Sequence, residues 1–464
     1  MALRRKCDPR PSPAPARPAG VERLHSLLGR PPPRPHESDL TVSELRPRAG
    51  TTALPVLARH GRLPKSHAAV TIVKFVAAAV AVLLVSGASV AAITLGQLQN
   101  NIKTVHLVGE TQGPPPDLGA FDGGFNVLIV GSDTREGQGA QFGKDDGVLN
   151  DVTMLVHISE DQTNAVAVSI PRDMVVPIPS CPREDGKGNY SAMSAMPINN
   201  TLAYGGLPCT VLTVQKLTGL EIPFAALITF QGVIQMSDAV GGVPVCVNGP
   251  LRDPYTGIDL PSAGTYTLQG ADALAFLRSR HGVGDGSDLG RISSQQVYLS
   301  SLVRTVKSND TLTNFGKLYG IAQAATQNMT LSDNLKNLNT MVSMALVLKG
   351  IPLDHITFVQ YPSTTGVGGV YSGKVAPLTA PATALFAKLK ADEPFTLDSG
   401  TGRGSVADPS APTGQTGTTT PPVTPPSTGA STPPSSSTPP TNAAPLSGVL
   451  GQTAADYTCS KVNN

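Results

Sequence analysis

The chain has 464 residues, with 47 Gly, 42 Pro, 4% aromatic residues and no Trp. Length alone allows two or three domains, but this composition excludes a chain that buries a core along its whole length. The formal net charge of +2 is unevenly distributed, because residues 1–66 hold 13 Lys and Arg against 5 Asp and Glu, a local excess of +8.

The basic N-terminal arm, 1–70, is rich in Pro, and such arms are either disordered cytoplasmic tails or contacts for nucleic acid or anionic lipid. The next segment favours the tail. Residues 75–95 carry no charge and span roughly 30 Å as a helix, the thickness of a hydrocarbon core. We therefore predict a single transmembrane helix over 71–97, a cytoplasmic arm and no nucleic-acid partner, because Lys and Arg crowd the N-terminal side. A cleaved signal peptide would begin nearer the N-terminus.

The segment 118–398 has the patterns of one folded domain outside the cell membrane. Apolar runs bounded by turn residues predict strands, and 3.6-residue periodicity with Gly stops predicts helices. Together they predict an α/β domain with a central mixed sheet flanked by helices. The expected strands are 125–133, 152–159, 165–171, 243–247 and 355–362, and the expected helices are 196–206, 209–219, 229–242, 270–280, 288–308, 311–326 and 333–348.

The C-terminal part is predicted to be a Pro/Ser/Thr-rich linker, 399–446, and a short tail, 447–464. Four of the five Cys residues lie after the predicted membrane helix, where an oxidising environment favours disulfides. Three pairings are possible. We expect Cys181 to pair with Cys209, and Cys246 to pair with Cys459 and dock the tail onto the domain.

Several Arg and Asp residues stand at predicted strand ends and on one helix. Arg carries a planar fork that matches phosphate oxygens, and two acids at neighbouring strand ends provide the oxygen ligands that Mg²⁺ prefers. The pattern predicts binding and transfer of a diphosphate, with ordinary surface ion pairs as the alternative. No GxSxG, HExxH or Walker motif is present. The candidates are Asp133, Arg135, Asp151, Arg172, Asp173, Arg278, Arg280, Arg291 and Gln295.

Six motifs in order resemble the LytR–CpsA–Psr (LCP) family of cell-wall polymer ligases: LIVGSDTR, DVTMLVHIS, VAVSIPRDM, AVGGVPV, LQGADALAFLRSRHG and DLGRISSQQ. The six motifs cover about residues 120–310. With the later predicted helices and the strand over 355–362, the resemblance extends over 118–398. It implies a phosphotransferase that moves a glycopolymer from a polyprenyl diphosphate carrier to the muramic acid 6-hydroxyl of peptidoglycan. Arabinogalactan is one candidate polymer, because the composition is similar to that of actinobacterial proteins; teichoic acid and capsule are the alternatives.

The resemblance also implies roles for the candidate residues. Asp133 and Asp151 match the family's Mg²⁺ (or Mn²⁺) ligands, and the polyprenyl tail would occupy an apolar tunnel between sheet and helices. The residues expected around the diphosphate are Arg135, Arg172, Arg278, Arg280, Arg291 and Gln295, with Asp173 a further candidate for substrate binding.

Two departures from the family pattern bear on this assignment. Leu149 stands where the family usually has an Arg, and the Gly-rich insert before it carries Lys144, Asp145 and Asp146. Arg135 or Lys144 would replace the missing cation, and either acid of the insert would compete for the metal. The Leu149 departure favours a non-catalytic lipid- or wall-binding scaffold, and a polyprenyl diphosphate pyrophosphatase is the second enzymatic alternative.

Overall fold

The computed structural model describes residues 68–411, apart from 112, 114, 115, 118, 135–146, 184, 309, 310, 312, 313 and 399, together with 445–463. The predicted arm up to residue 67 and the predicted linker from 412 to 444 lie outside the described residues. The chain divides into two units, Met1–Val73 and Lys74–Asn464, and the description below concerns the second, together with the start of its first helix.

Helix α1 (Ala68–Asn100) contains the whole predicted transmembrane stretch. It is the one helix in the described part of the chain that is both long and apolar enough to cross a membrane. Its apolar side chains up to Ile93 are exposed, whereas Leu98 in the last turn is buried against the domain that follows. The helix is therefore unpacked along most of its length and packs against the domain only within its last two turns.

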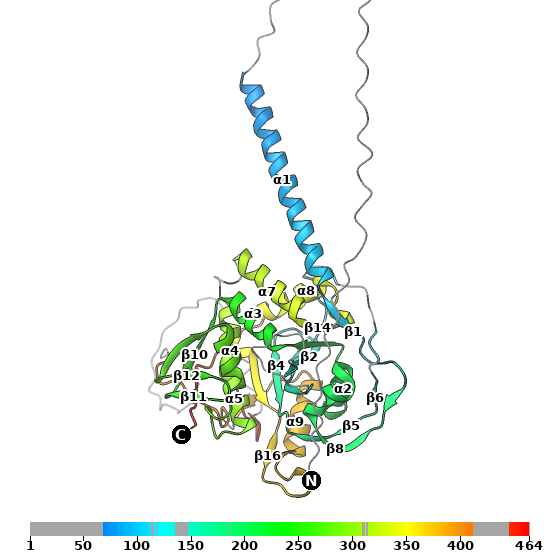
Figure 1. Cartoon of the computed structure of the whole chain (residues 1–464), viewed down its shortest axis with the longest axis vertical. Helices are drawn as coiled ribbons and strands as arrows, with labels where there is room; N and C mark the ends of the chain where they lie inside the picture. Colours follow the sequence, from blue (N-terminus) through cyan, green and yellow to red (C-terminus); the bar gives the residue numbers. More distant parts are fainter. Residues whose placement is uncertain are drawn as a thin grey trace, which may run out of the picture. The chain divides into compact units, whose positions relative to one another are not determined.

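The domain is built around an eight-stranded mixed sheet (Figure 1). Strands β2 (Phe125–Ser132), β3 (Asn150–Ile158) and β4 (Ala165–Ile170) pair antiparallel in sequence order, so the strands expected over 125–133, 152–159 and 165–171 are confirmed. Strand β9 lies parallel to β2, and β15 lies parallel to β4. In spatial order the strands are β1 (Lys103–Val105), β14 (Met329–Ser332), β9 (Phe224–Ile228), β2 (Phe125–Ser132), β3 (Asn150–Ile158), β4 (Ala165–Ile170), β15 (Ile356–Gln360) and β21 (Gly451–Thr453).

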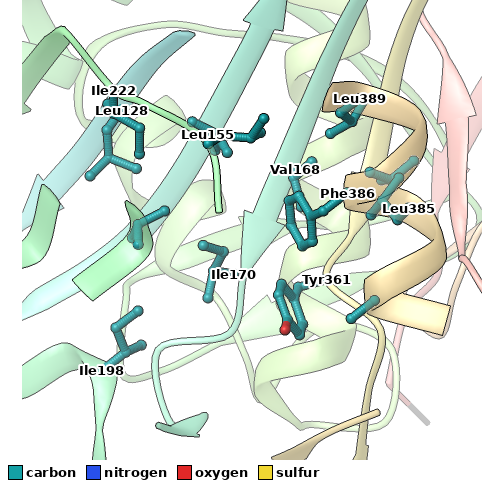
Figure 2. Packing of buried hydrophobic residues seen from close by; sticks show 14 of the residues in the cluster. Leu128, Leu155, Val168, Ile170, Ile198, Ile222, Tyr361, Leu385, Phe386 and Leu389 are labelled. Atoms are coloured by element: carbon teal, nitrogen blue, oxygen red, sulfur yellow. The ribbon is translucent and has the colours of Figure 1, made fainter. Parts of the chain in front are cut away.

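Both faces of this sheet are buried, which explains why its central strands are continuous apolar runs. Along β2, Leu128 and Val130 point to one face, while Val127 and Ile129 pack on the other. The first face is covered by α2 (Thr201–Thr218) and α9 (Thr379–Lys390). Figure 2 shows Leu385, Phe386 and Leu389 of α9 packed beside Val168 and Tyr361.

The second face is covered by α5 (Asp288–Lys307) and α8 (Leu338–Gly350). Helix α5 also packs on a smaller four-stranded sheet with the order β13 (Gly264–Leu268), β10 (Val243–Val247), β22 (Thr458–Ser460) and β19 (Ser405–Ala407). Helices α3 (Phe230–Val240), α4 (Gly270–Arg278) and α7 (Phe315–Asn328) pack beside them.

The remaining elements are short. They are β5 (Val175–Ile178), β6 (Cys181–Pro182), β7 (Asn189–Tyr190), β8 (Met193–Pro197), β11 (Leu251–Asp253), β12 (Ile258–Leu260), β16 (Ser363–Thr365), β17 (Val375–Pro377), β18 (Thr396–Leu397) and β20 (Pro445–Leu446), with 3₁₀ turns at Ile198–Asn200, Asp333–Leu335, Leu353–His355 and Gly369–Tyr371.

The expected helix over 196–206 is wrong in its first half, because Met196 and Pro197 pair in β8 with β5 and Ile198–Asn200 form a 3₁₀ turn. Its second half runs into the next helix as α2, across a kink at Gly205 and Gly206. Gly206 has a φ of 66°, which a residue with a side chain rarely adopts. The non-helical backbone at Gly205 and Gly206 separates two helical segments of α2, so the predicted Gly stop is confirmed. Helix α9 was not predicted.

The C-terminal tail is part of the fold. Strand β21 adds to the edge of the large sheet, and β22 lies between β10 and β19 in the small one. Cys246 and Cys459 are directly paired across β10 and β22, and they form a disulfide. The second bond joins Cys181 to Cys209. Both expected pairings are confirmed.

Candidate active site

Asp151 and Arg172 meet where β3 begins and β4 ends. Thr153 pairs with Ile170 in the antiparallel register, so two residues further along each strand Asp151 stands opposite Arg172. The Arg172 guanidinium donates to Asp151 Oδ1. Burial opposes the charge on Arg172, but the neighbouring Asp151 carboxylate outweighs it and raises the Arg172 pKa. The two residues form the base of the site.

Asp288, the first residue of α5, organises the arginines above this base. Its buried carboxylate accepts from the backbone N–H of Arg172 at 3.1 Å. The same group lies 2.5 Å from Arg291 Nη2 and 3.6 Å from Arg280 Nη2. A carboxylate in the first helical turn also interacts favourably with the helix dipole. One carboxylate thus fixes the backbone of Arg172 and pairs with the guanidinium groups of Arg280 and Arg291, which come from different segments.

This cluster of Arg172, Arg280 and Arg291 is short of acceptors. Burial lowers the pKa of Arg280, and the adjacent positive charges of Arg291 and Arg172 lower it further. Within the described part of the chain, Arg172 Nε, Arg280 Nη2 and Arg291 Nε are buried nitrogens without a hydrogen-bond partner. An unsatisfied buried donor is costly, and phosphate oxygens match the geometry of these groups. The cluster is therefore suited to an anion with several oxygens.

An apolar cavity of about 200 Å³ opens beside the cluster. Arg291, Asp151, Arg278 and Gln295 form the polar part of its wall. Burial raises the pKa of Tyr298, another wall residue. The remaining lining comes from β2, β3, α3, α4 and α5: Ile129, Gly131, Ser132, Val152, Met154, Ile228, Thr229, Phe230, Val233, Met236, Ser237, Leu274, Leu277, Leu299 and Leu302.

The side chains of Arg278 and Arg280 have different neighbours in the site. Arg278, at the end of α4, lies over the Phe230 ring, 4.4 Å from its centroid, in the cavity wall. Arg280 lies in the loop beyond the helix and faces Asp288. Gln295 donates to the Leu277 carbonyl at 2.8 Å, which ties α5 to the end of α4. The predicted residues are thus brought together around Arg291, with Gln295 in a supporting place.

Asp253 and the C-terminal tail hold the loop that carries Arg280. Burial disfavours the Asp253 carboxylate, but hydrogen bonds from the Ser279 hydroxyl and from backbone N–H groups of the loop outweigh this and lower its pKa. The Arg280 N–H is one of these donors, at 3.0 Å. On the other side, the Gly284 N–H donates to the Lys461 carbonyl at 2.8 Å. A strand-end acid and a tail residue, neither predicted, thus fix the loop.

The two predicted metal ligands occupy neighbouring strand ends. Asp133 Oδ1 accepts from the Leu149 N–H at 2.7 Å, and the Asp133 N–H donates back to the Leu149 carbonyl. Asp133 is thereby tied to the segment that leads into Asp151. Two carboxylates completed by substrate phosphate oxygens are a set that Mg²⁺ accepts, so the donor chemistry fits. Arg135, Lys144, Asp145 and Asp146 lie outside the described residues.

Asp173 stands at the rim of the cluster. It lies 3.7 Å from Arg172 Nε and 3.3 Å from Lys374 Nζ. Lys374 and Asp288 were not predicted as site residues. Asp288 had a detectable signal, since it follows a capping Ser287 and stands three residues before Arg291. No pattern in the sequence indicated Lys374, because it is 201 residues away from Asp173 along the chain.

Comparison with known proteins identifies the family to which the chain belongs. The LytR_cpsA_psr family model matches residues 86–385. The cell wall biosynthesis protein LcpA of Corynebacterium glutamicum is 32% identical over 280 residues, 54% of this chain and 52% of the relative. The polyisoprenyl-teichoic acid–peptidoglycan teichoic acid transferase TagT of Bacillus subtilis is 28% identical over 312 residues, 65% of this chain and 89% of the relative.

Among solved structures, a LytR-Csp2A-Psr enzyme from Actinomyces oris aligns with a TM-score of 0.46 at 24% identity, over 62% of this chain and 95% of that one. The chain spans about half the length of the two Corynebacterium relatives. The family match covers well over half of the chain, and it includes each Arg and Asp of the site. The chain belongs to the LytR–CpsA–Psr family.

Proposed function

We propose that this protein transfers a glycopolymer from a polyprenyl diphosphate carrier to peptidoglycan. The observation that carries the proposal is the junction of two unlike surfaces: three arginines with unpartnered buried donors lie beside the mouth of an apolar cavity. A lipid diphosphate has the same two parts. Its charged head suits the guanidinium groups, and its hydrocarbon tail suits the cavity.

In the proposed reaction, a peptidoglycan hydroxyl oxygen attacks the phosphorus that carries the sugar. A new P–O bond forms, the bond to the polyprenyl phosphate oxygen breaks, and polyprenyl monophosphate leaves with that electron pair. The hydroxyl proton passes to solvent, because the Asp151 carboxylate is already paired with Arg172 and is a proposed metal ligand. Arg172, Arg280 and Arg291 hold the diphosphate and stabilise the negative charge that develops on its oxygens, which is the largest catalytic term in such reactions.

The proposal assigns a divalent cation, Mg²⁺ or Mn²⁺, to Asp133 and Asp151. When bound, the ion would neutralise charge on the diphosphate. The assignment is supported by the two carboxylates at adjoining strand ends and by the preference of hard cations for such oxygens.

We further propose that α1 anchors the protein in the cell membrane with residues 1–67 in the cytoplasm and the domain outside. The basic composition of the arm supports this orientation. Both disulfides, Cys181–Cys209 and Cys246–Cys459, also suit an oxidising exterior. The donor polymer in this proposal is a cell-wall glycopolymer, with arabinogalactan as the first candidate to test.

The test is turnover of a synthetic polyprenyl diphosphate-linked oligosaccharide by the purified full chain, with and without peptidoglycan. Label joined to peptidoglycan, together with release of polyprenyl monophosphate, is the expected result. Release of phosphorylated sugar at the same rate without acceptor would make the protein a pyrophosphatase. Tight donor binding without turnover in either arm would make it a scaffold.

A further inference from the structure

The last turn of α1 is joined to the segment that leads into α8. The side chain of Gln99 donates to the Lys336 carbonyl at 2.6 Å, and Leu98 is only 5% exposed. The predominantly apolar stretch ends at Leu95, five residues before the end of the helix, or about 7 Å at the helical rise. The surface around Lys336 therefore lies close to the edge of any bilayer that α1 spans.

Helix α8 lies at the end of the domain near the last turn of α1 (Figure 1), and three of its large apolar side chains are exposed. Val342 is 43% exposed, Leu346 45% and Leu348 36%. Val342 and Leu346 are four residues apart and share one side of the helix, whereas Ser343 and Met344 are buried against the domain. An exposed apolar group of this kind marks an interaction surface more often than chance exposure.

Charge favours a lipid surface as the occupant. Helix α8 contains no Asp or Glu, and Lys336 and Lys349, both exposed, flank its apolar side chains. An apolar stripe bordered by Lys is the composition of helices that lie in a membrane interface. The tether also holds this face near one membrane at high effective concentration, an advantage that a freely diffusing protein partner lacks.

We propose that the α8 face, formed by Val342 and Leu346 between Lys336 and Lys349, docks into the headgroup region of the membrane that α1 spans. This inference rests on the membrane anchorage in the proposed function. Docking would also orient the substrate cavity. Leu299 of α5 lines that cavity and belongs to the same apolar cluster as Met341 and Val347 of α8, so α8 packs on the layer that supplies one wall of the cavity.

The absence of Trp from the chain permits a direct test. Leu346→Trp in the full chain, reconstituted in vesicles of phosphatidylcholine and phosphatidylglycerol, gives a single reporter on the face. Brominated phospholipids should quench it several-fold more than they quench Tyr255→Trp, a control at a 77% exposed position in the β11–β12 turn. Both variants should melt like the wild-type chain.

The outcomes of this experiment distinguish a failure of the docking from a failure of the membrane anchorage. If the chain does not float with the vesicles, the anchorage fails and the docking with it. If it floats but the two reporters are quenched equally little, the α8 face does not touch lipid and the docking alone is overturned. A blue-shifted Leu346→Trp emission without bromine quenching would mean that protein covers the face, which also overturns the proposal.

Discussion

The carboxylate of Asp288 accepts a hydrogen bond from the backbone N–H of Arg172 at 3.1 Å. This contact joins the first residue of α5 to Arg172, which lies two residues after β4. The two residues are 116 positions apart in the chain. Because the same carboxylate also faces Arg280 and Arg291, it sets the positions of all three arginines of the cluster. The site therefore depends on an acidic residue whose charge has the same sign as that of the ligand that the arginines would bind.

Replacing Asp288 by Asn should therefore destabilise the protein strongly. The change keeps the shape but leaves Arg280 and the buried Arg291 without their shared anion, and removal of one partner from a buried ion pair costs about 3–5 kcal/mol. The measurement is the free energy of unfolding in urea. Asp259→Asn, in the exposed pair with Arg252, is the matched control, with an expected cost under about 1 kcal/mol. An equal loss in the free energy of unfolding for both variants would show that Asp288 does not hold the arginine cluster together.

Asp133→Ala and Asp151→Ala should each lower the transfer rate by about 10²-fold or more, by analogy with loss of one preorganised catalytic group. Chelator treatment of the wild-type chain should have a similar effect that Mg²⁺ or Mn²⁺ reverses. Transfer assays at several metal concentrations check both. Full activity of the wild-type chain in excess chelator would remove the metal from the proposal while leaving the arginine cluster in place.

The strands around the site were predictable because their apolar runs are buried on both faces, and Asp151 and Arg172 followed from the ends of those strands. Asp288 was missed because an acid in a first helical turn is common without any special partner. The tail strands β21 and β22 have three residues each, too few for a period, and they form only by pairing with β15 and β10. Lys374 reaches Asp173 through long-range packing, which a single sequence does not encode locally.

Asp253→Ala should loosen the loop that carries Arg280, because the Ser279 hydroxyl and the loop N–H groups lose their acceptor. We expect a loss of about 1–3 kcal/mol in stability, and weaker donor binding below the melting temperature. The lowered pKa of Asp253 means that its stabilising effect is complete above the ordinary Asp pKa of about 3.9 and is lost as pH falls through the lowered value. Wild-type and variant stabilities should thus converge under acid; a constant gap would refute the role.

The tail disulfide should matter for activity as well as for stability. Cys459 is two residues before Lys461, whose carbonyl accepts from the Gly284 N–H in the Arg280 loop. Breaking either disulfide should cost about 2–4 kcal/mol. Cys246→Ser with Cys459→Ser should also slow transfer at temperatures where the protein is folded. The double variant of Cys181 and Cys209 is the control: it should melt lower but transfer normally. The same loss of transfer in both would reduce the tail to a stabilising element.

The proposed topology predicts a specific cleavage pattern. Protease added to intact spheroplasts should degrade the domain and leave residues 1–67 protected, because the arm is on the far side of the membrane. Detection by tags at each end of the chain reads out both segments at once. Protection of a C-terminal tag together with loss of an N-terminal tag would invert the orientation and place the site in the cytoplasm.

The most direct test of the central claim is the initial rate of glycopolymer transfer by Arg280→Ala, beside its melting temperature. Arg280 lies in a loop, and its Nη2 is a buried donor without a hydrogen-bond partner in the described structure, so its loss should leave the fold intact and slow transfer by about 10²-fold. Arg280→Lys should also be slow, since a point charge does not reproduce a planar fork. Arg252→Ala, which breaks the exposed pair with Asp259, should transfer at the wild-type rate. An Arg280→Ala protein that melts normally and transfers as fast as Arg252→Ala would contradict the assignment of the arginine cluster to the diphosphate.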